Sequence, residues 1–197
     1  GLIVAAVIFR IIPHPFNMTP LIAIVLFAGA KFENKKLAFI IAMLTLFLSD
    51  VIISYMNNYP LLHSTILFTY GTVWLIVLLG TVLKGKFNIG KTAGITLLAS
   101  LLFFVISNFG VWLFSNMYTL NLEGLINCYV MAIPFNKFSW AGDLIFSFAL
   151  FGIYEIVSNK IIETADNTKN LLEQLRLYVS VILSIDSALC NGAGFEM

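Results

Sequence analysis

Long apolar runs separated by short polar stretches are the dominant pattern of the chain, and they predict an all-α polytopic membrane protein. The runs give a bundle of six expected transmembrane helices, at residues 2–12, 19–30, 36–55, 64–83, 91–114 and 140–159. A helix needs about 20 apolar residues to cross a bilayer, and the last four runs are that long. The run 19–30 is shorter, so we expect a half-span or steeply packed helix, with Pro20 in its first turn and Thr19 as its cap. We expect residue 1 to lie inside the first helix.

The apolar stretch 120–135, before the expected sixth helix, is interrupted by polar residues and a proline. It contains Asn121, Glu123, Gly124, Asn127 and Pro134. Backbone groups at membrane depth must be satisfied by the protein itself. We therefore expect an interfacial or re-entrant segment here, and not a further span.

The composition changes after residue 160, which divides the chain into an expected membrane bundle at 1–160 and a cytoplasmic amphipathic tail at 161–197. Residues 166–168 (Asp-Asn-Thr) can cap a helix over 169–189. Apolar residues of that helix recur at helical spacing and form one stripe: Leu171, Leu172, Leu175, Tyr178, Val179 and Ile182. The stripe fits a helix lying on the bilayer or on the bundle, and it also fits a helix that docks a partner.

The composition of the whole chain agrees with the membrane assignment. Hydrophobic residues make up 60% and charged residues 11% of the sequence, and the mean hydropathy is +0.96. An average soluble domain carries about 25% charged residues, so a soluble globular domain is excluded. Lys and Arg (11) balance Asp and Glu (10), so we expect no nucleic-acid partner. Cys128 and Cys190 belong to no CxxC or Cys/His cluster, so we expect no structural metal and no cofactor.

The positions of the basic residues predict the orientation of the bundle. Of the 11 Lys and Arg residues, only Arg10 and Lys137 fall in the first, third and fifth loops. Loops on the cytoplasmic side carry an excess of Lys and Arg. We therefore expect both termini and the second and fourth loops in the cytoplasm. Trp112 and Trp140 then lie at the outer interface, which amphipathic rings prefer.

Polar residues that are costly near a bilayer core gather in the outward half of the expected bundle. They are Asn17 in the first loop, Asp50 near the end of 36–55, His63 in the third loop, Asn108 and Trp112 one turn apart on 91–114, Cys128 in the fifth loop and Asp143 at the start of 140–159. This clustering predicts a ligand-binding site beneath the outer loops. Structural explanations stay open beside it: Asp50 can satisfy loop N–H groups, the helix dipole favours Asp143, and Cys128 can be a small buried hydrophobe.

Small residues and missing motifs narrow the remaining possibilities. Ala38 and Ala42 lie on one face of 36–55, and residues 28–30 (AGA) end the helix before it. Such residues let helices approach closely, by default within one chain. The sequence holds no GxSxG, HExxH, Walker A or GxGxxG motif, so we expect the protein not to be an enzyme.

Two groups of motifs resemble a family of small bacterial membrane proteins. The first group is 10–20 (RIIPHPFNMTP), 28–30 (AGA) and 48–50 (LSD), and the second is 124–129 (GLINCY), 133–135 (IPF) and 142–144 (GDL). The resemblance covers about residues 1–160. This family is similar in size and six-helix layout to the substrate-binding S components of energy-coupling factor transporters. It is similar, more distantly, to the solitary S components that transport corrinoids.

This resemblance implies a function and a place in the cell. S components are vitamin-uptake subunits of the bacterial cytoplasmic membrane, with both termini inside and substrate bound beneath the outer loops. The likeness implies a substrate-binding subunit for a vitamin-like molecule, with a corrinoid favoured. Imidazole and thiolate bind late first-row metals, so His63 or Cys128 is a candidate axial ligand of the corrinoid cobalt. The AxxxA pattern with which S components often dock a shared partner is missing from residues 2–12. The alternative is a non-catalytic accessory subunit of a larger membrane complex, held through its small-residue helix faces and its tail.

Overall fold

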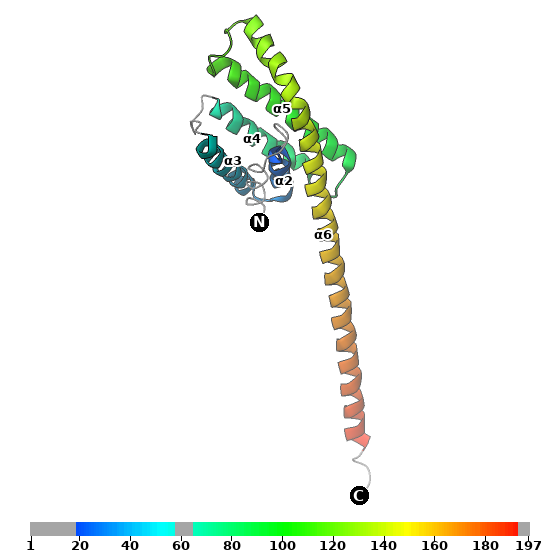
Figure 1. Ribbon diagram of the computed structural model, residues 1–197. Helices are drawn as coiled ribbons and strands as arrows, with labels where there is room; N and C mark the ends of the chain where they lie inside the picture. The colour runs from blue at the N-terminus through cyan, green and yellow to red at the C-terminus, as the bar shows by residue number, and fades with distance from the viewer. Residues whose placement is uncertain (1–18, 58–64, 193–197) are drawn as a thin grey trace. The chain divides into compact units, whose positions relative to one another are not determined.

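The computed structural model describes residues 19–57 and 65–192, and these residues form five α-helices with no strand among them. The helices are α2 (Leu21–Lys31), α3 (Lys35–Asn57), α4 (Ile66–Gly80), α5 (Ile89–Phe114) and α6 (Leu122–Gly192), and the short 3-10 helix η1 (Thr81–Leu83) follows α4 (Figure 1). The all-α prediction is confirmed. The expected helix at 2–12 lies outside the described residues.

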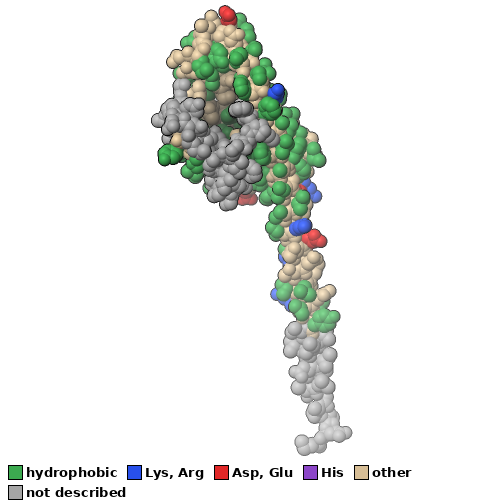
Figure 2. Space-filling view, viewed as in Figure 1, with side chains coloured by type: hydrophobic (Ala, Val, Ile, Leu, Met, Phe, Trp, Pro, Cys, Tyr) green, Lys and Arg blue, Asp and Glu red, His purple; other side chains and the backbone are tan. Residues whose placement is uncertain are grey.

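Three helices in the described part of the chain are long and apolar enough to cross a membrane. They are Ile66–Leu83, Ile89–Phe114 and the part of α6 from Leu122 to Tyr178. Large apolar side chains on their outer faces are exposed, as hydrocarbon-facing side chains would be, and Figure 2 shows hydrophobic side chains over much of the visible surface. The chain is therefore compatible with a membrane protein, while the predicted count of six spans is not supported.

The sequence predicted separate segments at 120–135, 140–159 and 169–189, whereas the structure has one continuous helix, α6, over all of them except its first two residues. The stretch 120–135 is not re-entrant, since α6 begins at Leu122 and contains Pro134. Its polar residues start the helix: the Asn121 side chain accepts a hydrogen bond from the Gly124 N–H at 2.8 Å. Asp143 therefore lies well inside α6 and does not open a helix, so the helix dipole does not explain it.

The expected tail helix at 169–189 is likewise part of α6. The hydroxyls of Thr164 and Thr168 donate to the carbonyls of Lys160 and Thr164, each at 2.9 Å, so they bond back to their own helix and leave it unbroken. By its contacts the chain divides into two compact units, Gly1–Ile153 and Tyr154–Met197. In the second unit, exposed charged side chains of both signs line the helix (Figure 2). The domain boundary at residue 160 stays a prediction.

Helix α2 forms the centre of the first unit. It has 11 residues, and all except Lys31 are buried, against α3, α4 and α5. The Phe27 ring also meets the Phe151 ring of α6 edge to face, with 5.3 Å between centroids. Its start differs from the prediction, because Pro20 occupies the N-cap position and Thr19 does not cap the helix. At about 1.5 Å per residue α2 is roughly 17 Å long, so it is short as predicted, while its place as a half-span in the membrane stays a prediction.

Two glycines bring the backbones of α2 and α4 into contact. A Cβ atom built on Gly29 would overlap the Val77 carbonyl, and one built on Gly80 would overlap the Leu26 carbonyl. The small residues 28–30 therefore serve a close crossing within the chain, as predicted. Ala38 and Ala42 of α3 are fully buried in the same core.

Two lysine side chains donate hydrogen bonds to backbone carbonyls where α2 ends and where α3 and α5 begin. Lys35 Nζ donates to the carbonyls of Gly29 and Phe32, at 2.6 and 2.7 Å, and so satisfies the last turn of α2. Lys31 Nζ donates to the Gly85 carbonyl at 3.2 Å. Desolvation, and then repulsion by the Lys84 ammonium, lower the pKa of Lys35. The connection between α2 and α3 and the connection between η1 and α5 therefore lie side by side.

Candidate ligand-binding cavity

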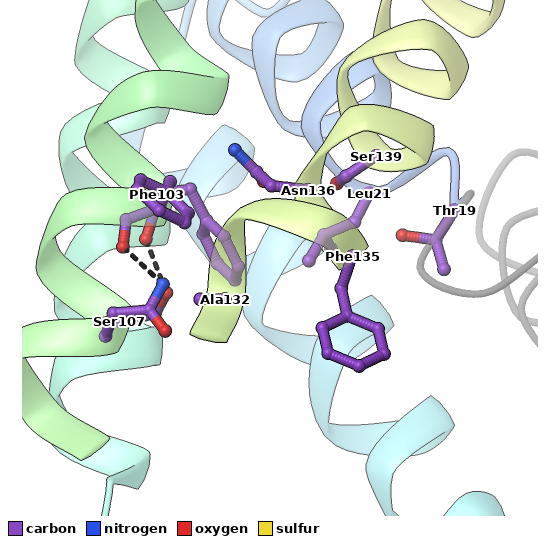
Figure 3. Close-up of a pocket in the computed structure, with 10 residues that line it drawn as sticks. Thr19, Leu21, Phe103, Ser107, Ala132, Phe135, Asn136 and Ser139 are labelled. Atoms are coloured by element: carbon purple, nitrogen blue, oxygen red, sulfur yellow. Dashed lines mark hydrogen bonds between the residues drawn. The ribbon is translucent and has the colours of Figure 1, made fainter. Parts of the chain in front are cut away.

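A cavity of about 390 Å³ opens between α5 and the first part of α6, close to the start of α2. Both long helices line it with residues three to four apart, which lie on one helix face. The lining residues are Phe103, Phe104, Ser107 and Asn108 of α5, Ala132, Phe135, Asn136 and Ser139 of α6, and Thr19 and Leu21 (Figure 3). Pro134 lies in the same stretch of α6, where its missing N–H removes one helical hydrogen bond.

The polar groups of α5 that face the cavity are partly satisfied within their own helix. Ser107 Oγ donates to the Phe103 carbonyl at 2.6 Å, and Asn108 Nδ2 donates to the Phe104 carbonyl at 2.7 Å (Figure 3). The amide oxygen of Asn108 is left to accept from another group. On α6, the side chains of Asn136 and Ser139 make no hydrogen bond to another described residue. The wall thus offers a few uncharged donors and acceptors among three aromatic rings.

The predicted site residues separate into three groups. Asn108 lines the cavity, and Asp143 lies one helical turn beyond Ser139 on α6, buried at 2% exposure. Asn17 and His63 lie outside the described residues.

The other three predicted residues make structural contacts. Asp50 accepts a hydrogen bond from the Tyr70 hydroxyl at 3.3 Å, between α3 and α4. Trp112 Nε1 donates to the Thr119 carbonyl at 3.0 Å and so fixes the connection between α5 and α6. The buried Cys128 thiol donates to the Asn108 carbonyl at 3.4 Å.

Sequence reasoning missed most of the cavity wall, including Phe103, Phe104, Phe135, Asn136 and Ser139. The signal was present in the spacing. Residues 132, 135, 136, 139 and 143 follow one helix face, but only when 120–135 and 140–159 are taken as one helix. Treating the first stretch as non-helical separated these residues from one another.

Comparison with known families decides the affiliation of the chain. A family of unknown function (DUF6580) matches residues 1–168, which is most of the sequence. The chain belongs to the DUF6580 family. No curated protein and no solved structure matches this DUF6580 member. Helix α5, the part of α6 that lines the cavity and all of the described lining residues fall within the matched residues.

Proposed function

We propose that this DUF6580 protein binds a small organic molecule in the cavity between α5 and α6, and that it is a substrate-binding membrane subunit for uptake of that molecule. The cavity supports this proposal. Its volume of about 390 Å³ lies within the range of roughly 300–1,000 Å³ that ligand sites occupy. Such sites combine apolar and aromatic walls with a few placed polar groups, and this wall has that composition.

The chemistry of the wall limits the class of ligand. The described lining residues include no Lys, Arg, His, Asp or Glu, so none of them would neutralise a charged ligand. The rings of Phe103, Phe104 and Phe135 suit a flat apolar part, and the amides of Asn108 and Asn136 suit carbonyl or N–H groups. An uncharged, partly planar molecule with hydrogen-bonding groups fits best. The volume favours a molecule smaller than a corrinoid, whose macrocycle joins four five-membered rings; corrinoid binding stays a prediction that the same experiment tests.

We further propose that the bundle lies in a bacterial cytoplasmic membrane and that both of its termini face the cytoplasm. The lysine-bearing loops support this proposal, because the bond from Lys31 to the Gly85 carbonyl joins the two loops that the sequence assigns to the cytoplasm. The connection at 115–121 lies at the opposite end of α5 from one of these loops.

The second candidate is an accessory subunit of a larger membrane complex. Its support is the second unit, where Leu171, Leu172 and Leu175 are more than half exposed along α6. The two candidates differ in what the cavity does, because an accessory subunit needs no ligand there.

The test compares two alanine-to-phenylalanine substitutions on the same helix. Ala132→Phe places a ring in the cavity, whereas Ala149→Phe adds the same ring at an exposed position away from it. Native mass spectrometry of the purified protein should show a bound small molecule in the wild type and in Ala149→Phe. In Ala132→Phe the bound fraction should fall, because we expect the affinity for the molecule to drop by about tenfold or more, a loss of about 1.4 kcal/mol.

In a second measurement, candidate compounds, a corrinoid among them, are added to the same proteins, and the rise in melting temperature reports binding. Equal occupancy in Ala132→Phe and Ala149→Phe would contradict binding in the cavity. A folded wild type that neither carries nor is stabilised by any compound would favour the accessory subunit.

A further inference from the structure

Four polar side chains lie together in the apolar interior of the first unit, outside the cavity wall. Asp143 and Ser147 belong to α6, and Thr96 and Ser100 belong to α5. Asp143 is 2% exposed, and Thr96 and Ser147 are 0% exposed. Ionisable and polar groups at such positions in a membrane bundle are costly, so each needs a partner.

The hydrogen bonds within this polar cluster leave it incompletely satisfied. Ser100 Oγ lies 2.7 Å from Asp143 Oδ2 and 2.9 Å from the Thr96 carbonyl oxygen. A serine hydroxyl has one proton, so it donates fully to one of these acceptors at a time. Among the described residues, the buried hydroxyls of Thr96 and Ser147 have no hydrogen-bond partner. A buried unpaired polar group is unfavourable, and these two lie one helical turn from the residues of the Ser100–Asp143 hydrogen bond, which points to a missing ligand.

The antiparallel packing of α5 and α6 places the four residues within about one helical turn of one another along the helix pair. Cys128 contacts Asn108, whereas Asp143, further along α6, contacts Ser100, which comes earlier in α5. Thr96 is one turn before Ser100 and Ser147 is one turn after Asp143. Because the helices are antiparallel, Thr96 and Ser147 both lie on the same side of the Ser100–Asp143 bond along the helix pair.

Charge balance defines what the missing ligand is. Among the described residues, no Lys, Arg or His forms an ion pair with Asp143; on its own helix the adjacent charged residues are Lys137 and Glu155, which lie more than one turn away. An ionised carboxylate in these surroundings needs a compensating positive charge. One carboxylate with three hydroxyl oxygens is a hard, singly negative donor set. It suits a hard monovalent cation, whereas Ca²⁺ and Mg²⁺ sites use more carboxylates or waters and softer metals use nitrogen or sulfur.

We propose that Asp143, Ser100, Thr96 and Ser147 form a Na⁺-binding site inside the helical bundle. The carboxylate supplies the charge, and the hydroxyl oxygens of Thr96 and Ser147 gain a partner that the described residues do not provide. A proton on Asp143 would serve Ser100 but would leave the other two hydroxyls unpaired. The site begins one turn from Ser139 and from Phe103 of the cavity wall, on the same two helices, yet it does not depend on what the cavity binds.

The test measures thermal unfolding of the purified full-length protein in detergent, in NaCl, KCl or N-methylglucamine chloride at one ionic strength. A ligand that binds only the folded state raises the melting temperature as its concentration rises. We expect Na⁺ to raise it selectively in the wild type and to have no selective effect in Asp143→Asn. Thr96→Val and Ser147→Ala should each raise the half-saturating Na⁺ concentration by about tenfold.

A matched control is Thr72→Val, since Thr72 is equally buried but donates to the Phe68 carbonyl at 2.6 Å within α4. It should keep the wild-type Na⁺ response. Without Na⁺, Thr96→Val should melt no lower than the wild type, because it removes an unpaired hydroxyl. If Asp143→Asn does not fold, Thr96→Val and Ser147→Ala decide the question.

Several results would overturn the proposal. They are an equal response to Na⁺ and N-methylglucamine, a Na⁺ response retained in Asp143→Asn, or stabilisation by acid alone, which would assign a proton to Asp143. The same Na⁺ dependence of the melting temperature in Thr96→Val and Thr72→Val would also overturn it. Ala132→Phe should keep the Na⁺ response, so failure of the cavity proposal and failure of the Na⁺ site can be told apart.

Discussion

The contact between α2 and α4 allows a sharp test of the fold through a single methyl group. Gly29→Ala adds a Cβ that would overlap the Val77 carbonyl and lie 3.1 Å from the Gly80 Cα. Both neighbours are backbone, so no side chain can rotate away, and the two helices must separate. Gly71→Ala adds the same atom to α4 where nothing lies within 4 Å.

The expected magnitudes follow from these surroundings. Forcing extra atoms into a packed core typically costs about 1–3 kcal/mol, and replacing Gly by Ala in a helix returns about 0.5–1 kcal/mol. Separation of the helices also loosens Val25 and Leu26, which are fully buried at this crossing. We expect Gly29→Ala to lower the free energy of unfolding by about 2 kcal/mol, and Gly71→Ala to raise it by about 0.5 kcal/mol. In a chain of this size the first change lowers the melting temperature by roughly 4–8 °C.

The assay is thermal or denaturant-induced unfolding of both variants in the same detergent. A double variant, Gly29→Ala with Gly80→Ala, gives an internal check. Because the first methyl group already separates the helices, the second should cost less than it does alone. Equal stability of Gly29→Ala and Gly71→Ala, or full additivity of the two costs in the double variant, would contradict a backbone contact between α2 and α4.

Two further predictions concern the loops that carry the lysines. Lys35→Met should lower the free energy of unfolding by about 1–3 kcal/mol in the same assay, because two carbonyls at the end of α2 lose a charged donor; an unchanged midpoint would contradict that role. In a background with both native cysteines changed to serine, cysteines replacing the exposed Glu33 and Lys86 should resist an impermeant thiol reagent applied outside intact cells, while one replacing the exposed Met117 should react. Labelling of the first two would reverse the proposed orientation.

The start of a helix could be predicted from the sequence where a polar residue caps an apolar run. The Asn34 and Asn88 side chains accept hydrogen bonds from the N–H groups of Lys36 and Lys91, and α3 and α5 begin within two residues of the predicted positions. The same signal misled after residue 160, where Thr164 and Thr168 bond to carbonyls of their own helix. A hydroxyl can cap a helix or bond back to it, and the pattern of residue types does not distinguish the two.

The cavity and the polar cluster depend on how two helices pair, which periodicity does not encode. Asn108 and Asp143 were singled out because polar residues are rare in such a chain. Ser100 became relevant only when the structure placed it 2.7 Å from Asp143, 43 residues further along. Phe103 and Phe135 are ordinary apolar residues in sequence, and the pairing of α5 with α6 alone makes them a wall.

The length and burial of α2 have a consequence for the biogenesis of the protein. A nascent segment is inserted across a bilayer when it offers about 20 apolar residues, and α2 is only 11 residues long. Among the described elements, the helices that bury it within its unit, α3, α4 and α5, all follow it in the chain and are synthesised later. We therefore predict that α2 reaches its final position only after those partners have been inserted, in a second stage of assembly. Substitutions that weaken the α2–α4 crossing should accordingly reduce the yield of folded protein in the membrane more than they reduce insertion of α4 and α5.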